Sequence, residues 1–530
     1  MLMKIKKALF LVAAFFVMAS SASAATYYLA PPDAGHPSGG TGGTGTIDDP
    51  WHDLNYALNR SVNGGTYARV RPGDTLYLRG GVHDIRNMTV VGESTGVSPK
   101  LYLETTSAAS PTTTIKSYPG EWAILDGFNT YGILHSGGTN YNFVFENFEV
   151  RNGTTYEGSG LGFGSGHGAV SFVNSVFRNI YFHDNGDDNY DNNPNGLALA
   201  GDGCIVEYCT FENNGHKTGG TTYSISGSWN PANLLMYEYY DSYLDIDDNP
   251  RKQNIVRYNR FIGSDCAIKY KGFGNNVDSS GTYENALVDR QPTWGDEIHH
   301  NLFTGVGSPY GAMMQQDLAK IHHNIFTGYG AGAVYAYPVN QNHDTLPALA
   351  WEVEVYNNTF YNNTVDITTR ELQNNPPERT YLQGGYNWEF YNNLHKSNTG
   401  AYYYSMFSDP DNSSHNNWPQ REDHSGFDSA SSKSIGRYQG TNRSLAQWQS
   451  ITNPRTGTTT LGANSFYSTI ALNSDYSIPA GSAAIGSGRD SADLGAVPYG
   501  ETSWYDSVGY TETGTPDTIS PASPSGLSVL

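Results

Sequence analysis

A short motif that recurs through the middle of the chain limits the folds open to this sequence more than any other feature. Each copy alternates polar and apolar residues, closes on Phe or Leu, and is followed by a polar turn. The copies are IVEYCTFENN (205–214), IVRYNRFIGS (255–264), IHHNLFTGVG (298–307), IHHNIFTGYG (321–330), VEVYNNTFYNN (353–363) and WEFYNNLHKS (388–397). The closing residues Phe303 and Phe326 are 23 residues apart. A strand-like repeat of this length without a helical pattern predicts a β-solenoid, in which each coil buries one face against the next.

Two columns of equivalent residues follow from aligning the copies. The closing residues form a column of apolar anchors: Phe211, Phe261, Phe303, Phe326, Phe360 and Leu394. Two positions before the anchor stand Asn259, Asn301, Asn324, Asn358 and Asn392. Because equivalent residues of successive coils stack, the second column predicts an asparagine ladder whose side-chain amides hydrogen-bond from coil to coil.

This repeat pattern resembles the right-handed parallel β-helix of the pectate-lyase-like superfamily. GTIDDPWHDLNYAL, followed by RPGDTLYLRGGVH (71–83), is similar to the N-terminal cap of such proteins, where a short amphipathic helix plugs the end of the barrel. DYSIPAGSAAIGSGRDSADLGAVPYG (475–500) is similar to the segment with which such chains close. The resemblance implies an all-β fold. It leaves function open, because lyases, hydrolases, epimerases and adhesins all use β-helices.

The ends of the chain set the expected domain boundaries. Residues 1–24 have the basic start, apolar centre and small-residue cleavage site of an export signal. The β-helix domain is expected over 25–500, and 501–530 reads as a Thr/Ser/Pro linker that leads into a truncated fibronectin-type module. No later segment is apolar enough to span a bilayer, so we predict a secreted or cell-surface protein without membrane insertion, and we expect a monomer.

The net charge and the cysteines narrow the partners further. A net charge of −21 disfavours nucleic acid and anionic membrane surfaces as partners. Cys204, Cys209 and Cys266 are an odd number and too sparse for a disulfide framework, so we interpret them as small buried residues.

A second series of short strands lies between the copies of the motif. Its members are GLALAG (196–201), LDIDD (244–248), AIKYKG (267–272), AMMQQ (312–316), AVYAY (333–337) and VDITTR (365–370). Alternation sends Ile268 into the solenoid and Lys269 and Lys271 outward. Asp247 and Lys269 are 22 residues apart, about one coil, so we predict that they are neighbours on one exposed face.

Charged residues gather around this predicted face. As calcium ligands we predict Asp187, Asp188, Asp191, Asp245, Asp247 and Asp248, because Ca²⁺ takes several oxygen ligands in irregular geometry. As catalytic residues we predict Lys269, Lys271 and Arg290, and as substrate-binding residues Arg251, Tyr335, Tyr337, Asp366 and Arg370. The two lysines of one strand face disfavour each other's charge, which lowers their pKa toward the range that a base needs.

These residue types suit β-elimination on an acidic polysaccharide. A uronate loses the proton next to its carboxylate when the carboxylate is neutralised and a base stands nearby. The calcium-dependent polysaccharide lyases built on this fold use such an arrangement, and tyrosines near the face fit an extended glycan. We therefore predict a secreted lyase that cleaves a uronate-containing glycan with the help of Ca²⁺. The overall negative charge opposes this function, because it repels a polyuronate.

Other interpretations of the same residues stay open. Asp247, Asp248, Asn249 and Pro250 also make good turn chemistry. A glycoside hydrolase would instead use two carboxylates of the same face, for example Asp245 or Asp247 with Asp366. A surface β-helix that binds glycan without catalysis is a third possibility.

The paired histidines are a separate motif. His299 with His300 and His322 with His323 recur 23 residues apart and could bind Zn²⁺ or Cu²⁺. They repeat together with the whole motif, so we interpret them as ladder residues of the coil.

Overall fold

The structure is a computed structural model of the chain. It describes residues 24–32, 43–59, 69–87, 100–101, 107–130, 132–136, 140–153, 163–164, 172–186, 195–199, 201–215, 232–237, 253–263, 266–271, 296–305, 313–315, 319–330, 332–336, 351–369, 386–397, 400–406, 421–428, 433–438, 441–453, 457 and 459–509. In this part of the chain, no helix is long and apolar enough to cross a membrane.

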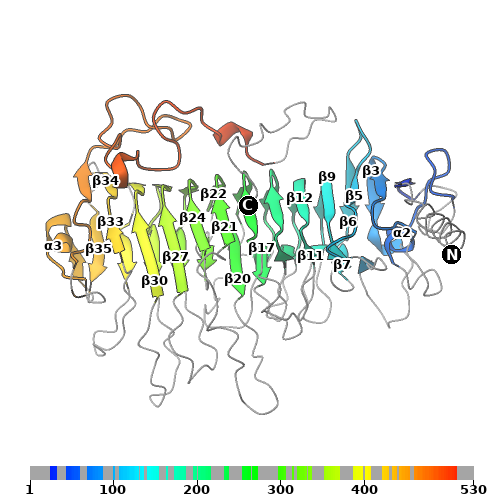
Figure 1. Cartoon of the computed structure of the whole chain (residues 1–530), viewed down its shortest axis with the longest axis horizontal. Coiled ribbons are helices and arrows are strands. Elements are labelled where there is room, and N and C mark those ends of the chain that lie inside the picture. The colour runs from blue at the N-terminus through cyan, green and yellow to red at the C-terminus, as the bar shows by residue number, and fades with distance from the viewer. Residues whose placement is uncertain are drawn as a thin grey trace, which may run out of the picture.

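The described strands wind into a long parallel β-helix, as the repeat predicts (Figure 1). They form one sheet of 22 strands, a second sheet of 12 and a third sheet of three. Neighbouring strands in the sheets pair in parallel, with the exception of the antiparallel pair β35 and β36 at the C-terminal end of the second sheet. Each coil therefore pairs only with the coils before and after it, which is the solenoid arrangement.

The long sheet holds two strand columns on either side of a bend. The first column contains β1 (Thr26–Leu29), β2 (Thr75–Leu78), β5 (Thr113–Ser117), β15 (Ile205–Glu207), β18 (Ile255–Arg257), β21 (Asp296–His299), β24 (Ala319–His322), β27 (Trp351–Tyr356), β30 (Tyr386–Tyr391) and β33 (Arg421–Asp423). The second contains β3 (Gly81–Asp84), β6 (Ala123–Asp126), β16 (Thr210–Glu212), β19 (Arg260–Ile262), β22 (Leu302–Thr304), β25 (Ile325–Thr327), β28 (Thr359–Tyr361), β31 (Leu394–Lys396), β34 (Gly426–Asp428) and β37 (Phe466–Ser468). The longer strands β9 (Phe143–Arg151) and β12 (Val176–His183) run through both columns.

The remaining elements complete each coil and close the ends. The second sheet contains β4 (Lys100–Leu101), β7 (Leu134–Ser136), β10 (Phe163–Gly164), β13 (Asn195–Leu199), β17 (Ala232–Tyr237), β20 (Ile268–Lys271), β23 (Met313–Gln315), β26 (Val334–Ala336), β29 (Ile367–Thr369), β32 (Tyr402–Met406), β35 (Ser434–Tyr438) and β36 (Thr441–Arg443). The third sheet contains β8 (Asn140–Tyr141), β11 (Phe172–Val173) and β14 (Gly201–Asp202). The helices are α2 (Leu54–Leu58) and α3 (Leu445–Gln449), and the 3₁₀ turns are η2 (Ile85–Asn87), η3 (Arg489–Ser491) and η4 (Tyr505–Ser507).

Both ends of the solenoid are plugged by a short helix. At the N-terminal end, α2 begins at the cap residue Asp53, whose side chain accepts a hydrogen bond from the Tyr56 backbone, and it buries Leu54 and Leu58. This is the predicted capping helix. At the other end, α3 begins at Ser444 with a capping box and buries Trp448.

The bend between the two columns has a fixed conformation in every repeat. The residue just before each ladder position has a positive φ, for example 55° at Tyr258, 56° at His300, 52° at His323 and 51° at Asn357. A single left-handed residue turns the chain sharply, and asparagine adopts this conformation more readily than most residues do. The bend explains why the residue with positive φ and the ladder residue after it recur in each coil.

The ladder asparagines form the predicted column, with one correction. The Asn259 amide donates to Asn301 Oδ1 at 3.0 Å, and the same contact joins Asn301 to Asn324 at 3.0 Å and Asn324 to Asn358 at 3.1 Å. The next member is Asn393, whose Oδ1 accepts from the Asn358 backbone at 3.0 Å. The prediction of Asn392 was wrong because the last copy is shifted by one residue: Asn392 is the left-handed residue, with φ 54°.

The same shift changes the last apolar anchor. Phe211, Phe261, Phe303, Phe326 and Phe360 stack in register with ring centroids 4.6 to 5.1 Å apart. His395, and not Leu394, continues this stack at 5.0 Å from Phe360. A histidine fits the interior here because both of its ring nitrogens have hydrogen-bond partners, described below.

The three cysteines are free and buried, as interpreted from their number. Burial raises the pKa of the Cys204 and Cys209 thiols to about 12, so both are neutral, inert parts of the core.

Residues 470–509, named here the C-terminal strap, run back along the outside of the second strand column (Figure 1, orange to red). The Gly495 backbone donates to Asn392 O at 3.1 Å, and the Gly509 backbone donates to Tyr258 O at 3.0 Å. The strap covers outward-facing Leu302 and Ile325, which cluster with its own apolar side chains. It includes the segment 475–500 that was expected to close the domain and also the first residues of the expected linker.

Candidate active site

Lys269 lies on the outer face of the second sheet, in β20. Its neighbours Ile268 and Ala267 belong to the main interior core. In the preceding coil, Leu235 pairs with Lys269 and forms with Ala198 a separate small cluster on the opposite face of the sheet from that core. The predicted alternation, with Ile268 inward and Lys269 outward, is therefore confirmed.

The outer face around Lys269 is nevertheless closely covered. Ala198 and Leu235 have no exposed surface, Lys269 is 7% exposed, and Thr368 further along the sheet is 2% exposed. The prediction that this face is exposed at Lys269 was thus wrong. A lysine this nearly buried is unusual in proteins.

The predicted pairing of Asp247 with Lys269 is wrong. The strand before β20 is β17, and it places Leu235 beside Lys269 and Tyr237 beside Lys271. The segment LDIDD, which was expected to be that strand, follows β17 in the sequence and lies outside the described residues, with Asp245, Asp247 and Asp248 in it. The segment LDIDD lies one coil length before AIKYKG in the sequence, so the spacing predicted that it forms the neighbouring strand. The strand that pairs with β20 is instead formed by ANLLMY.

The carboxyl ends of the strands are where most of the other predicted residues join the sheet. The second-sheet strands are parallel, so their last residues share one edge. The connection 238–254 leaves β17 at this edge and carries Asp245, Asp247, Asp248 and Arg251, and the connection 272–295 leaves β20 there and carries Arg290. Lys271 is the last residue of β20. Tyr337 and Arg370 begin the connections that leave β26 and β29.

This carboxyl edge is the candidate active site. Connections of 17 and 24 residues leave it after β17 and β20, whereas only two residues separate β15 from β16 at the bend of the long sheet. Long connections on a rigid scaffold are where binding and catalytic residues concentrate. The side chains of Lys271, Arg251, Arg290, Tyr337 and Arg370 lie outside the described residues, so their roles stay predictions.

The second predicted acidic segment joins the sheet at the opposite edge. Asp187, Asp188 and Asp191 lie outside the described residues, in the connection that enters β13 at its first residue, Asn195. That connection does not leave the carboxyl edge, so the topology gives no reason to group these aspartates with Asp245, Asp247 and Asp248.

Tyr335 falls on the predicted column. Through the register of β20, β23, β26 and β29, its backbone stands in line with Lys269, Met314 and Thr368. Its side chain lies outside the described residues, so the role in substrate binding remains a prediction.

Asp366 is not on the outer face. It has no exposed surface, and its Oδ2 accepts a hydrogen bond from His395 Nδ1 at 2.8 Å. The Tyr404 hydroxyl donates to His395 Nε2 at 2.9 Å. Burial lowers the pKa of His395, so this Asp, His and Tyr form a neutral-imidazole network inside the solenoid. The predicted substrate contact was wrong because β29 begins only at Ile367, and the chain before it turns Asp366 inward.

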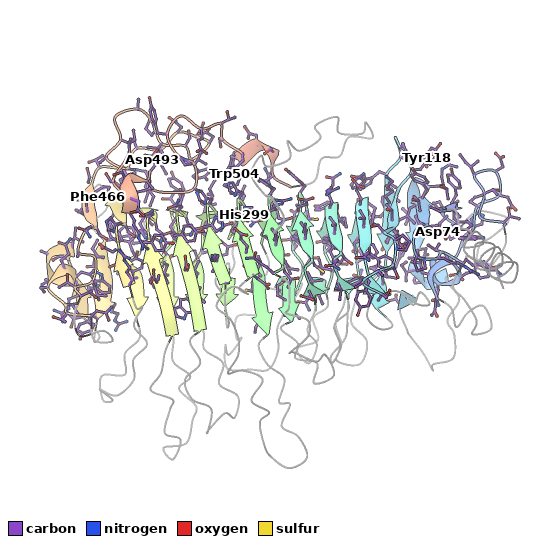
Figure 2. The ribbon with its side chains drawn as sticks, viewed as in Figure 1. Asp74, Tyr118, His299, Phe466, Asp493 and Trp504 are labelled. Atoms are coloured by element: carbon purple, nitrogen blue, oxygen red, sulfur yellow. The ribbon has the colours of Figure 1, made fainter. Side chains whose placement is uncertain are left out.

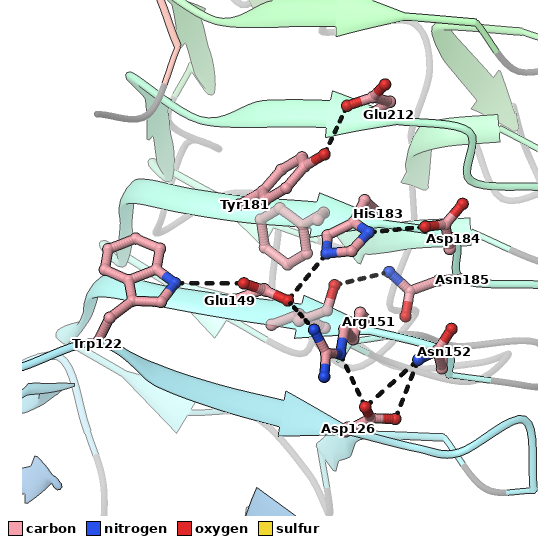
Figure 3. A network of polar contacts seen from close by, with 12 residues as sticks. Trp122, Asp126, Glu149, Arg151, Asn152, Tyr181, His183, Asp184, Asn185 and Glu212 are labelled. Carbon is pink, nitrogen blue, oxygen red and sulfur yellow. Dashed lines mark hydrogen bonds and ion pairs between the residues drawn. The ribbon is translucent and has the colours of Figure 1, made fainter. Parts of the chain in front are cut away.

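A polar network that the sequence analysis missed lies on the outer side of β6, β9 and β12 (Figure 3). Arg151 bridges Asp126 at 2.7 Å and Glu149 at 2.9 Å. His183 lies between Glu149 at 3.0 Å and Asp184 at 2.8 Å. Burial alone would lower the pKa of His183, but the hydrogen bonds to Asp184 and Glu149 raise it to about 9. Asp126, Glu149 and Asp184 each have a cationic partner, which indicates a structural role.

The network fixes the chain just before the connection that holds Asp187. Asn185, next to Asp184, has no exposed surface and donates to Val150 O at 3.0 Å and to Asn214 Oδ1 at 2.8 Å. Asn214 donates in turn to Asn233 of β17 at 2.9 Å. This second asparagine ladder recurs at irregular intervals of 29 and 19 residues, which is why repeat spacing did not reveal it.

The paired histidines stack on successive coils, as interpreted. His299 lies over His322 at 5.1 Å and His300 over His323 at 5.2 Å between ring centroids. Among the residues that the structure describes, no group of three or more His, Cys, Asp or Glu side chains is arranged to hold a metal ion.

No protein-family model matches the chain, and no curated protein matches its sequence. Solved structures that match include the pectate lyase Pel9A, at 14% identity, 90% coverage of this chain, 97% of that chain and a TM-score of 0.43. A mannuronic acid specific family 6 polysaccharide lyase from human gut microbiota matches at 10% identity, 76% and 81% coverage and a TM-score of 0.35. The alginate lyase AlyF-OU02 matches at 9% identity, 83% and 93% coverage and a TM-score of 0.31. The parallel strand pairing of this chain itself establishes the β-helix.

Proposed function

We propose that the protein is an exported polysaccharide lyase that cleaves a uronate-containing glycan by β-elimination. The observation that carries the proposal is the position of Lys269: outside the interior core, nearly buried, and on the strand whose carboxyl edge receives the long, charged connections. A positioned lysine can act as the base that removes the proton next to a carboxylate.

The reaction needs a base, a proton for the leaving oxygen, and positive charge at the carboxylate. A base, Lys269 or Lys271, takes the proton from the carbon next to the uronate carboxylate. The electron pair of that bond forms the new double bond, and the glycosidic oxygen leaves with its electrons and takes up a proton. Arg251 and Arg290 supply positive charge for the carboxylate, which lowers the cost of the negative charge that develops there. These cations also offset, locally, the negative charge of the whole chain.

The proposal includes a calcium ion at the carboxyl edge, and the residues that leave this edge fit such an ion. Asp245, Asp247 and Asp248 supply hard oxygen ligands, the type that Ca²⁺ prefers, on the connection that leaves the edge beside Lys271. A bound calcium would neutralise the substrate carboxylate. Asp187, Asp188 and Asp191 join the opposite edge, so we place the ion with the first three aspartates.

The experiment compares two signals on a panel of uronate polymers, with and without EDTA. The expected result is ultraviolet absorbance from an unsaturated product, lost in Lys269→Ala or Lys271→Ala and kept in Lys320→Ala. Lys320 is an exposed lysine on the long sheet and serves as the matched control. New reducing ends without absorbance would overturn the lyase proposal in favour of hydrolysis, and neither signal would favour a binding protein.

The hydrolase alternative loses its specific residue pair. The pair given as its example needs Asp366 to reach a glycan together with Asp245 or Asp247, and Asp366 is buried against His395. A hydrolase would have to draw both carboxylates from elsewhere.

A further inference from the structure

Two histidine pairs form a compact array at the bend of neighbouring coils. In the pair His299 and His300 the Nδ1 atoms are 2.7 Å apart, and in His322 and His323 they are 2.8 Å apart. At such distances one Nδ1 of each pair must donate a proton and the other must accept it. An uncharged array is therefore satisfied, whereas two protonated rings in one pair would repel each other.

The direction of the bonds in the second pair follows from its ends. His322 Nε2 is 2.8 Å from Glu297 Oε1, and His323 Nε2 is 3.2 Å from the Asn357 amide nitrogen. An ionised Glu297 only accepts, so a neutral His322 donates from Nε2 and accepts at Nδ1. His323 then donates from Nδ1 and accepts from Asn357. This neutral arrangement leaves Asn357 Oδ1 buried without a partner.

The first pair faces the C-terminal strap. The Trp504 ring packs edge-on against His300 with centroids 5.5 Å apart, and Figure 2 shows Trp504 in the strap above the strand that carries His299. The indole nitrogen of Trp504 is buried and has no hydrogen-bond partner among the described residues. The contact is therefore ring packing, and it covers His300 on the side of the strap.

The strap spans the histidine positions. It is hydrogen-bonded to the left-handed residue Asn392 through Gly495 and to the left-handed residue Tyr258 through Gly509. His300 and His323 occupy the same position in coils between those two. Any charge that develops on these rings develops alongside the strap.

We propose that the strap is a proton-sensitive latch: the uncharged histidine pairs hold it on the solenoid at neutral pH, and their protonation in mild acid releases it while the coils stay folded. The proposal concerns regulation of the fold and does not depend on the lyase activity.

The charged and titratable groups around the array support this direction. Arg257 and Tyr258 of the preceding coil, Glu297 and Lys320 beside the array, and Tyr356 of the following coil face it. Burial first, and then neighbouring histidines, lower the pKa of His300 to about 2 and that of His323 to about 3. Burial also lowers the pKa of His299 to about 4.

The sign of the effect follows from linkage. Once freed from the array, His299, His300 and His323 titrate near about 6.5, whereas in the array burial keeps them neutral to lower pH. The released form therefore binds more protons, and release is favoured as pH falls below about 6.5, by up to about tenfold per pH unit for each freed histidine. The hydrogen bond from His322 lowers the pKa of Glu297, so protonation of Glu297 in stronger acid acts in the same direction.

Hydrogen exchange of the full chain tests the latch. Peptides covering 495–509 should lose at least about tenfold of their protection between about pH 7 and about pH 5, after correction for intrinsic exchange, while coil peptides keep theirs. His300→Tyr should remove most of this response. Tyrosine suits the position, because Tyr208 and Tyr258 occupy it in preceding coils with φ 54° and 55°. His83→Gln is the control, since His83 is also a buried histidine with a pKa lowered to about 4, far from the strap.

Three outcomes would overturn the proposal: protection of 495–509 that does not change in mild acid, an unchanged acid response in His300→Tyr, or loss of coil protection at the same pH. Should His300→Tyr fold poorly, the pH dependence of Trp504 fluorescence, taken as wild type minus Trp504→Phe, gives the same decision. A fluorescence change in mild acid with constant far-ultraviolet circular dichroism supports the latch, and a constant fluorescence overturns it.

Discussion

Lys269 lies beside Leu235 of the preceding coil, on the outer face of the second sheet. Leu235 has no exposed surface and Lys269 is 7% exposed, so packing holds the lysine in one place on this face. Strand pairing, and not the 22-residue spacing to Asp247, sets the neighbour of this lysine.

Removal of this lysine is the first prediction. We expect Lys269→Ala to lower kcat for uronate polymers by at least about 100-fold, because general-base catalysis contributes at least this factor. The melting temperature should change little, since Lys269 lies outside the interior core. Steady-state kinetics and thermal unfolding check both parts, with Lys320→Ala as the control that should retain full activity. An equal loss of kcat in both variants would show that Lys269 has no specific role in catalysis.

The repeat predicted most of the solenoid because its residues carry the coil geometry themselves. The apolar anchors and the ladder asparagines recur with the motif, so its coils could be placed from the sequence. Each copy was predicted as one strand, however, and folds as two strands on either side of the bend. Where a residue type changes, the alignment slipped: His395 replaces phenylalanine in the stack, and the apolar Leu394 beside it took its place in the prediction. A slip of one residue turns every side chain to the other face.

The site was harder to predict for a related reason. Residue counts between coils measure the whole connection, while register is set by strand pairing, and the two agree only when no loop is inserted. ANLLMY and LDIDD both alternate, and only the pairing of Leu235 with Lys269 decides between them. The prediction for Asp366 was wrong for another reason. The chain before β29 turns this residue inward, and its carboxylate has a buried histidine as partner.

The corrected ladder gives a second prediction. Asn393→Ala removes the acceptor for the Asn358 backbone and the donor to Val355 O at 2.8 Å, so it leaves buried polar groups unpaired. We expect it to lower the free energy of unfolding by about 3 kcal/mol. Asn392→Gly should cost only about 1 kcal/mol, since glycine adopts the left-handed conformation freely. Urea unfolding of the two variants measures the difference. A larger loss of unfolding free energy in Asn392→Gly than in Asn393→Ala would favour Asn392 as the ladder residue.

His183 gives a prediction about pH. Its pKa is raised to about 9 in the folded chain, so its interactions with Asp184 and Glu149 stabilise the fold fully below about 6.5 and lose that effect as pH rises through about 9. We expect wild type to exceed His183→Gln by about 2 kcal/mol in unfolding free energy near pH 6, with the gap closing by about pH 10. A gap that does not vary over this range would show that His183 stays uncharged.

The pKa of the buried Glu422 is raised, so this carboxyl group stays protonated at a pH where a surface carboxylate is ionised. Its side chain is 2% exposed, burial raises its pKa to about 8, and its Oε2 accepts a hydrogen bond from the Trp448 indole at 2.8 Å. The folded chain therefore keeps a proton on Glu422 that the unfolded chain releases above about pH 4.3. Stability from this group is complete below that pH and is lost as pH rises toward about 8.

Glu422→Gln should consequently stabilise the C-terminal cap at neutral and alkaline pH. Glutamine keeps an oxygen acceptor for Trp448 and carries no charge, so the variant should gain about 3 kcal/mol over wild type between about pH 5 and about pH 9. Unfolding free energies at several pH values give this gap directly. Asp423→Asn, at the more exposed neighbouring carboxylate, is the comparison variant: Asp423 accepts from the Asn464 backbone and side chain. If the gap of Glu422→Gln stays constant with pH, Glu422 is already ionised in the folded chain.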